Sequence, residues 1–238
     1  MSDAAVSAAP TALYVYGVVP AGTELDFTGV GIDSTSVRVL TERDLGALVG
    51  VVPLELFGEE PLRRNLQDRD WLERTAQAHG AVLERALGGT TVIPFRIATL
   101  YGTEDDLRGF LRANGDSLRE LLARLEHTVE LDVRVYLDQE SAMTREADAF
   151  AVDCARTSHE HLAMAALDAR LNRPQPAELS DRPARMILNG AYLVERGDRC
   201  LEQALRELES SFGEQGVTYE LTGPWPPYNF VPRELAGP

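Results

Sequence analysis

The chain has 238 residues, of which 44% are hydrophobic and 26% are charged, and its formal net charge at pH 7 is −15. This length suffices for one large or two small domains, each with its own core. The acidic balance argues against binding to nucleic-acid phosphates or anionic lipid, because both recruit positively charged surfaces.

The N-terminal part begins with a polar leader and continues with strands. Residues 1–10 are small and polar, so we predict a disordered leader, and they lack the basic region and apolar core of a signal peptide. Apolar runs at residues 12–19 and 46–52 predict two strands. A shorter strand at residues 37–40 is expected to pair with the second run across a turn at residues 43–44.

Helices and strands alternate over the next stretch. A helix is predicted from Asp68 to Leu87, because apolar residues recur there on one face and two glycines follow. A strand from Ile93 to Leu100 comes next. Thr103 has the position of an N-cap for a further helix, and Asn114 marks a break before the helical pattern resumes.

The clearest period of two in the chain runs from Val129 to Leu137 and places Glu130 on the polar face of a predicted strand. Beyond this strand the sequence changes to a charged, alanine-rich stretch that is predicted to be helical up to about Leu171. We therefore divide the chain into an N-terminal domain over residues 11–138 and a C-terminal domain over residues 139–222.

The C-terminal domain continues with a loop, a strand, a helix and a last strand. The loop covers residues 172–183, the strand 186–194, the helix 198–212 and the last strand 217–221. Strands interspersed with helices in both halves predict an α+β fold. Ferredoxin-like α/β sandwiches are the leading architecture, above all for the C-terminal domain.

The last residues, 223–238, are rich in proline and contain three large aromatic residues: Trp225, Tyr228 and Phe230. Proline fixes φ and donates no backbone hydrogen bond, so we predict an extended strap and not a helix or a central strand. A solvated linker does not need such rings. They either fill grooves on the protein's own body, with Trp225 as the anchor, or meet an aromatic-lined groove of a partner.

Three segments carry a family resemblance. Thr222–Phe230 resembles the C-terminal signature of the GvpF/GvpL family of gas vesicle proteins, Tyr14–Val19 resembles the family's opening strand, and Val92–Leu100 is similar to its central Pro-x-Arg strand. The resemblance implies two small α+β domains and a non-enzymatic role. Such a protein would be an accessory or minor structural component of the gas vesicle. It would bind the small apolar shell protein and other gas vesicle proteins in the cytoplasm, and assist assembly.

No motif points to catalysis, a cofactor or a metal. His159 and His161 are two residues apart, so on a helix their rings point in different directions and cannot share one ion. Two cysteines are too few for a disulfide framework, and no apolar run approaches the ~20 residues of a membrane span. We predict a soluble cytoplasmic protein. The alternatives are an enzyme on a ferredoxin-like scaffold with an unrecognised pocket, or a generic protein-interaction module.

Two further side chains stand out. Arg96 lies in an otherwise apolar strand, which predicts a largely buried guanidinium paired with an acidic side chain or, alternatively, with a carboxylate of a partner. His79 lies on the apolar face of its helix, which is typical of a hydrogen-bonded core histidine. The candidate partner-binding residues are Trp225, Tyr228, Phe230 and Arg96. The candidate structural residues are Gly17, Pro94 and His79.

Overall fold

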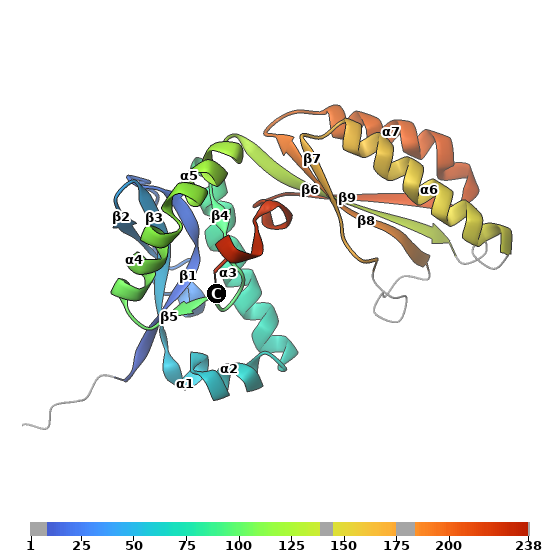
Figure 1. Ribbon diagram of the computed structural model, residues 1–238. Coiled ribbons are helices and arrows are strands. Elements are labelled where there is room, and N and C mark those ends of the chain that lie inside the picture. Colours follow the sequence, from blue (N-terminus) through green and yellow to red (C-terminus); the bar gives the residue numbers. More distant parts are fainter. Residues whose placement is uncertain (1–8, 139–144, 175–183, 238) are drawn as a thin grey trace, which may run out of the picture. The chain divides into compact units, whose positions relative to one another are not determined.

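The computed structural model describes residues 9–138, 145–174 and 184–237 (Figure 1). The predicted leader falls almost entirely outside the described residues. The chain forms two compact units. The first unit is Met1–Glu126 together with Val231–Pro238, and the second is His127–Phe230. Within the described residues, two antiparallel sheets and seven α-helices form an α+β protein, as the sequence predicts.

The first unit contains a five-stranded antiparallel sheet with the order β2-β3-β1-β4, in which β5 also pairs with β1. The strands are β1 (Thr11–Pro20), β2 (Arg38–Glu42), β3 (Leu45–Pro53), β4 (Ile93–Pro94) and β5 (Leu100–Tyr101). The central strand β1 is buried along almost its whole length, because apolar residues occupy both of its faces. The predicted hairpin between β2 and β3 is confirmed.

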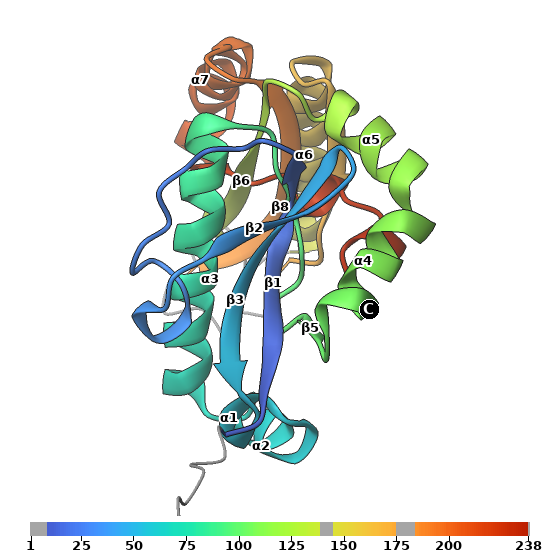
Figure 2. The same ribbon diagram turned by 90° about the vertical axis from the view of Figure 1, so that its left-hand side faces the viewer.

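Helices cover both faces of this sheet. They are α1 (Leu54–Phe57), α2 (Glu59–Asn65), α3 (Arg69–Gly89), α4 (Glu104–Ala113) and α5 (Gly115–Arg124), and a 3-10 turn spans Ile32–Ser34. Figure 2 shows α3 on one side of the sheet and α4 and α5 on the other. The predicted helix start is confirmed at Asp68, whose carboxylate accepts hydrogen bonds from two backbone amides of the first turn. The helix continues through both glycines that the sequence analysis placed after its end.

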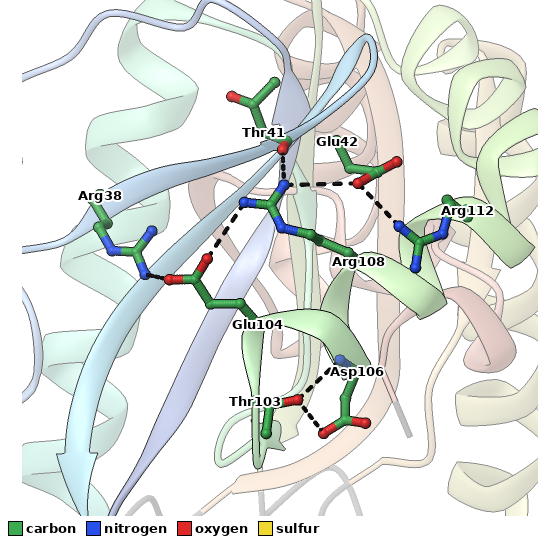
Figure 3. Close-up of polar contacts among 8 residues, drawn as sticks. All are labelled: Arg38, Thr41, Glu42, Thr103, Glu104, Asp106, Arg108 and Arg112. Carbon is green, nitrogen blue, oxygen red and sulfur yellow. Dashed lines mark hydrogen bonds and ion pairs between the residues drawn. The ribbon is translucent and has the colours of Figure 1, made fainter.

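An exposed polar network fastens α4 to the edge strand β2 (Figure 3). Arg38 contacts Glu104 at 2.5 Å, and Arg108 lies 3.4 Å from the second oxygen of the same carboxylate. Arg108 also donates to the backbone carbonyl of Thr41 and lies 3.7 Å from Glu42. Exposed ion pairs contribute little stability. Their main effect here is to occupy a carbonyl on the edge strand, which would otherwise be open to another strand.

The second unit contains a four-stranded antiparallel sheet with the order β7-β8-β6-β9. Its elements are β6 (Thr128–Asp138), α6 (Arg145–Met164), β7 (Asp168–Leu171), β8 (Ala184–Glu195), α7 (Cys200–Phe212), a 3-10 turn (Gly213–Gln215) and β9 (Val217–Trp225). Both helices lie on one face of the sheet (Figure 1). The hydroxyl of Tyr219 on β9 contacts that of Ser158 on α6 at 2.8 Å, which identifies the face that Tyr219 shares with the helices.

Several sequence predictions need correction. The strand from Val129 to Leu137 exists, but it pairs with β8 and β9, so the two units divide before β6 and not after it. The predicted strand Ile93–Leu100 is interrupted, because its backbone turns at Ala98, whose φ is 62°. The helical stretch predicted up to Leu171 ends at Met164, and the short edge strand β7 follows it.

The predicted continuous strap over residues 223–238 does not form. Its first three residues extend the edge strand β9, and two 3-10 turns follow, at Tyr228–Phe230 and Arg233–Leu235. Proline is compatible with this arrangement, because an edge strand leaves the outer backbone amides without a ladder partner. The final residues from Val231 onward belong to the first unit.

Candidate partner-binding site

A bulge in β9 brings Trp225 onto the same face of the second sheet as Glu130. Asp132 pairs with Thr222 and Glu130 pairs with Trp225, so β9 has one residue more than β6 between the two pairs. One extra residue reverses the face to which every following side chain points. Gly223 permits this bulge: its φ is 118°, and a Cβ atom there would lie 2.8 Å from the backbone oxygen of Glu130.

The carboxylate of Glu130 is the centre of the polar contacts on this face. It is 2% exposed. The backbone N–H of Asn229 donates to Oε2 at 2.8 Å, and the side-chain Nδ2 of Asn229 donates to Oε1 at 2.7 Å. Burial raises the pKa of Glu130 to about 7, and the hydrogen bonds from Asn229 partly oppose this rise. The two bonds hold the Tyr228–Phe230 turn against β6. This role is not apparent from the sequence, where Glu130 lies on the polar face of an alternating strand.

A cavity of about 360 Å³ lies on this face, opposite the face covered by α6 and α7. It is lined by Glu130, Asp132, Arg134, Thr222, Trp225, Tyr228 and Asn229. Three of these residues come from alternate positions of β6, two come from β9, and two come from the turn that follows. The site is therefore built from the polar face of one strand and the proline-rich end of the chain.

Asp132 has one carboxylate oxygen without a hydrogen bond to any described residue. Its Oδ1 is enclosed and has no hydrogen-bond partner within the part of the chain that the structure describes. Burial raises the pKa of Asp132, and the charge of Arg134 partly opposes this rise. Arg134 lies opposite Glu220 on β9, with Nη1 3.8 Å from Oε1, so it shares its charge with a second carboxylate.

The three aromatic residues of the tail have different surroundings. Trp225 is 36% exposed and Tyr228 is 41% exposed, and both rings border the cavity. The indole Nε1 of Trp225 donates to the hydroxyl oxygen of Thr222 at 3.4 Å. Phe230 is only 3% exposed, with the guanidinium of Arg170 5.5 Å above its ring. Phe230 is therefore a core residue of the second unit, whereas the other two side chains are exposed.

Arg96 belongs to the first unit and does not line this cavity. The side chain is exposed, and its Nη2 donates to the backbone carbonyl of Gly237 at 2.7 Å. The prediction of a buried guanidinium is therefore wrong. The reason is local: β4 ends at Pro94, so Arg96 lies beyond the strand, just before the turn at Ala98. The backbone amide of Arg96 donates to the carbonyl of Ala236, so this segment holds the end of the chain within the first unit.

The three candidate structural residues all lie in the core of the first unit. His79 is buried: its Nδ1 lies 3.0 Å from the hydroxyl of Tyr14, and its Nε2 lies 3.1 Å from the carbonyl of Phe95. Burial lowers the pKa of His79 to about 4, so the ring is neutral at pH 7. Pro94 is buried in β4. Gly17 pairs with it, and a Cβ atom on Gly17 would lie 2.5 Å from the backbone oxygen of Ile93.

The two neighbouring histidines contact different partners. His159 Nδ1 lies 3.1 Å from the hydroxyl of Tyr192, and His161 Nε2 lies 3.0 Å from a carboxylate oxygen of Glu207. Within the described ranges, no three His, Cys, Asp or Glu side chains are grouped so that they could hold a metal ion. Over these same ranges, no helix is long and apolar enough to cross a membrane.

Comparisons with known proteins give one consistent family. The family model described as gas vesicle synthesis protein GvpL/GvpF matches residues 12–151 and 140–232. The chain is 34% identical over 243 residues to gas vesicle protein L of a Streptomyces species, covering 90% of this chain and 88% of that protein. It is 29% identical over 224 residues to gas vesicle protein F of Haloferax mediterranei, covering 92% of each.

Solved structures show the same fold. The crystal structure of the gas vesicle protein GvpF from an Anabaena species matches with a TM-score of 0.70 at 20% identity, over 92% of this chain and 95% of that one. GvpF from Microcystis aeruginosa matches with a TM-score of 0.68 at 19% identity, over 92% and 98% of the two chains.

Proposed function

Because this chain belongs to the GvpL/GvpF family of gas vesicle synthesis proteins and is involved in gas vesicle formation, we propose that it binds the small apolar shell protein and assists assembly of the vesicle. The family consists of structural and assembly proteins and not of enzymes, which removes the enzymatic alternative. We place its action in the cytoplasm and at the gas vesicle, where other gas vesicle proteins are further partners.

The observation that carries the proposal is the exposure of Trp225 and Tyr228 beside the cavity of the second unit. Trp and Tyr are the residues most enriched among side chains that dominate binding energy at protein interfaces. Their large apolar rings suit an apolar partner, and their polar atoms tolerate water when the partner is absent. Arg96 is exposed as well, and we retain it as a second proposed contact in the first unit.

The test is a binding measurement with purified full-length protein. The shell protein is kept in solution by fusion to a soluble carrier, and the carrier alone serves as the blank. We expect binding that weakens by tenfold or more in Trp225→Ala, equivalent to ~1.4 kcal/mol. Thermal unfolding of the variant, followed by circular dichroism, checks that it is folded.

The matched control is Met164→Ala, which removes a 79% exposed apolar side chain from α6, on the opposite face of the same sheet. This variant should bind like the unchanged protein. Equal losses of binding in both variants would mean that any exposed apolar residue contributes. The cavity beside Trp225 would then no longer be assigned as the binding site. An absence of binding by the unchanged protein would refute shell-protein recognition altogether.

We also propose that the second unit has a ferredoxin-like topology and that the two units are separable domains. The element order β6-α6-β7-β8-α7-β9 and the strand order β7-β8-β6-β9 support the first point. A fragment of residues 127–230 tests the second. It should give cooperative thermal unfolding, and a fragment without a transition would contradict separability.

A further inference from the structure

We propose that the cavity beside Trp225 receives an arginine side chain of the partner protein, with Asp132 accepting the charge and the rings of Trp225 and Tyr228 flanking the guanidinium. This inference rests on the proposed function in one respect: the arginine belongs to the protein that binds this face. It adds the chemical identity of the group that enters the cavity.

The first observation is that one carboxylate oxygen of Asp132 has no hydrogen bond from the part of the chain that the structure describes. One of its oxygens is enclosed without a hydrogen-bond donor among the described residues, although the side chain lines the cavity. A buried acceptor without a donor is costly, and a charged one more so. Because the negative charge is shared by both carboxylate oxygens, a cation in the cavity stabilises the whole group. Cation binding therefore lowers the electrostatic cost of the partly buried charge, whereas the enclosed oxygen still has no donor in the described chain.

Asp132 lies in a field of acidic and basic side chains. On β6 its neighbours on the same face are Glu130 and Arg134, and on β9 Glu220 lies opposite Arg134. The residues of β8 opposite these three β6 positions are Leu193, Ala191 and Asn189, none of which is charged. On β7, Asp168 and Arg170 lie opposite Leu193 and Ala191, and the two side chains contact each other at 2.5 Å. Among the described residues of this face, Arg134 and Arg170 therefore each lie beside a carboxylate other than that of Asp132. The whole chain adds to this field with a net charge of −15.

The two aromatic rings add selectivity for a planar cation. A cation over the face of an aromatic ring gains about 0.5–1 kcal/mol at exposed sites and more where water is excluded. Arginine combines stacking on a ring with a fork of N–H donors for a carboxylate, whereas lysine offers a compact, strongly hydrated charge. The cavity volume of about 360 Å³ fits one side chain. It is at the small end of ligand cavities in general.

The experiment titrates the protein with N-acetyl-L-arginine N-methylamide and follows the indole N–H signals by nuclear magnetic resonance. The chain has two tryptophans, so Trp71 in the first unit serves as an internal control. We expect saturable shifts of the Trp225 signal and none of the Trp71 signal. The affinity should fall about tenfold in Asp132→Asn, because the variant keeps the shape and removes the charge.

Two comparisons make the result specific. The matched variant Glu195→Gln removes an exposed acid from β8 and should leave the titration unchanged. The matched probe N-acetyl-L-glutamate N-methylamide should produce no shift. Saturable binding of the glutamate probe instead would identify Arg134 as the binding group and overturn the inference. The inference is also overturned if the arginine probe does not shift the indole N–H signal of Trp225, or if Asp132→Asn binds this probe as tightly as the unchanged protein does.

Shell-protein binding by the same variants separates this inference from the proposed function. If binding of the shell protein depends on Trp225 but the arginine probe does not bind, the proposed function is supported and the cation site is refuted. If the arginine probe binds but the shell protein does not, the cation site stands and its partner is a different protein. Asp132→Asn should be at least as stable as the unchanged chain, because it removes the charge of a partly buried carboxylate whose desolvation is costly.

Discussion

Glu130 should make the free energy of unfolding decrease as the pH rises from about 4.5 to about 7. Burial raises the pKa of its carboxyl group to about 7 in the folded chain, from an ordinary value of 4.5. The folded state therefore binds this proton more tightly than the unfolded state. Its stabilising effect is complete below pH 4.5 and is lost as the pH rises through 7. The difference between the two pKa values corresponds to about 3 kcal/mol.

The assay is urea unfolding across pH 4.5 to 8.5, followed by circular dichroism, for the unchanged protein and for Glu130→Gln. Glutamine cannot titrate, so the difference between the two curves isolates Glu130 from the many other acids of the chain. Glutamine also offers one acceptor oxygen where Asn229 donates two hydrogen bonds, which lowers stability by a constant amount. Glu195→Gln, an exposed site on β8, is the control and should give a curve parallel to that of the unchanged protein.

The sign of the pH dependence tests whether burial raises the pKa of Glu130 in the folded chain. A difference curve that is flat across this range would show that Glu130 has the same pKa in the folded and unfolded states. A difference that grows with pH would show that the two donors of Asn229 outweigh burial, so that the pKa is lowered. Either result would refute the argument from burial.

The remaining predictions concern single side chains, and each is measured by chemical unfolding of the variant against the unchanged chain. His79→Ala should lower the free energy of unfolding by about 2–4 kcal/mol, because it removes the buried hydrogen bonds from the ring to the hydroxyl of Tyr14 and to the carbonyl of Phe95. A decrease below 1 kcal/mol would show that water replaces the ring. Phe230→Ala should cost about 3–5 kcal/mol, as for other buried phenylalanines, and a negligible loss would place its ring outside the core. Arg96→Leu should cost about 1 kcal/mol or less, because the side chain is exposed, and a loss of several kcal/mol would restore the buried pair that the sequence suggests.

Elements with a strong local pattern could be predicted from the sequence. The helix α3 has a buried face that recurs with helical spacing, and Thr103 caps α4 by accepting a hydrogen bond from the backbone of Asp106. The family resemblance of the tail is confirmed by the match over residues 12–151 and 140–232. Each of these features depends on residues a few positions apart, and short-range spacing is visible in a single sequence.

Features that depend on distant partners could not be predicted. The pattern of β6 identifies a strand, but nothing local shows that β8 and β9 are its neighbours. The same limit explains Glu130, whose partner Asn229 is 99 residues away. A charged residue in an alternating strand is normally solvated. Only the pairing of β6 with β9, together with the bulge, places this one beneath the tail.

The sequence left open whether the tail packs on the protein itself or contacts a partner, and different side chains of the tail suit these two roles. Phe230 is buried and Asn229 is bound to Glu130, so these side chains fix the turn on the second unit. Trp225 and Tyr228 precede them in the chain and stay exposed. Fixing the backbone of one residue costs about 1–2 kcal/mol. Because folding already orders the backbone beneath the two exposed rings, a partner that contacts them meets a smaller part of that cost than it would on a disordered tail.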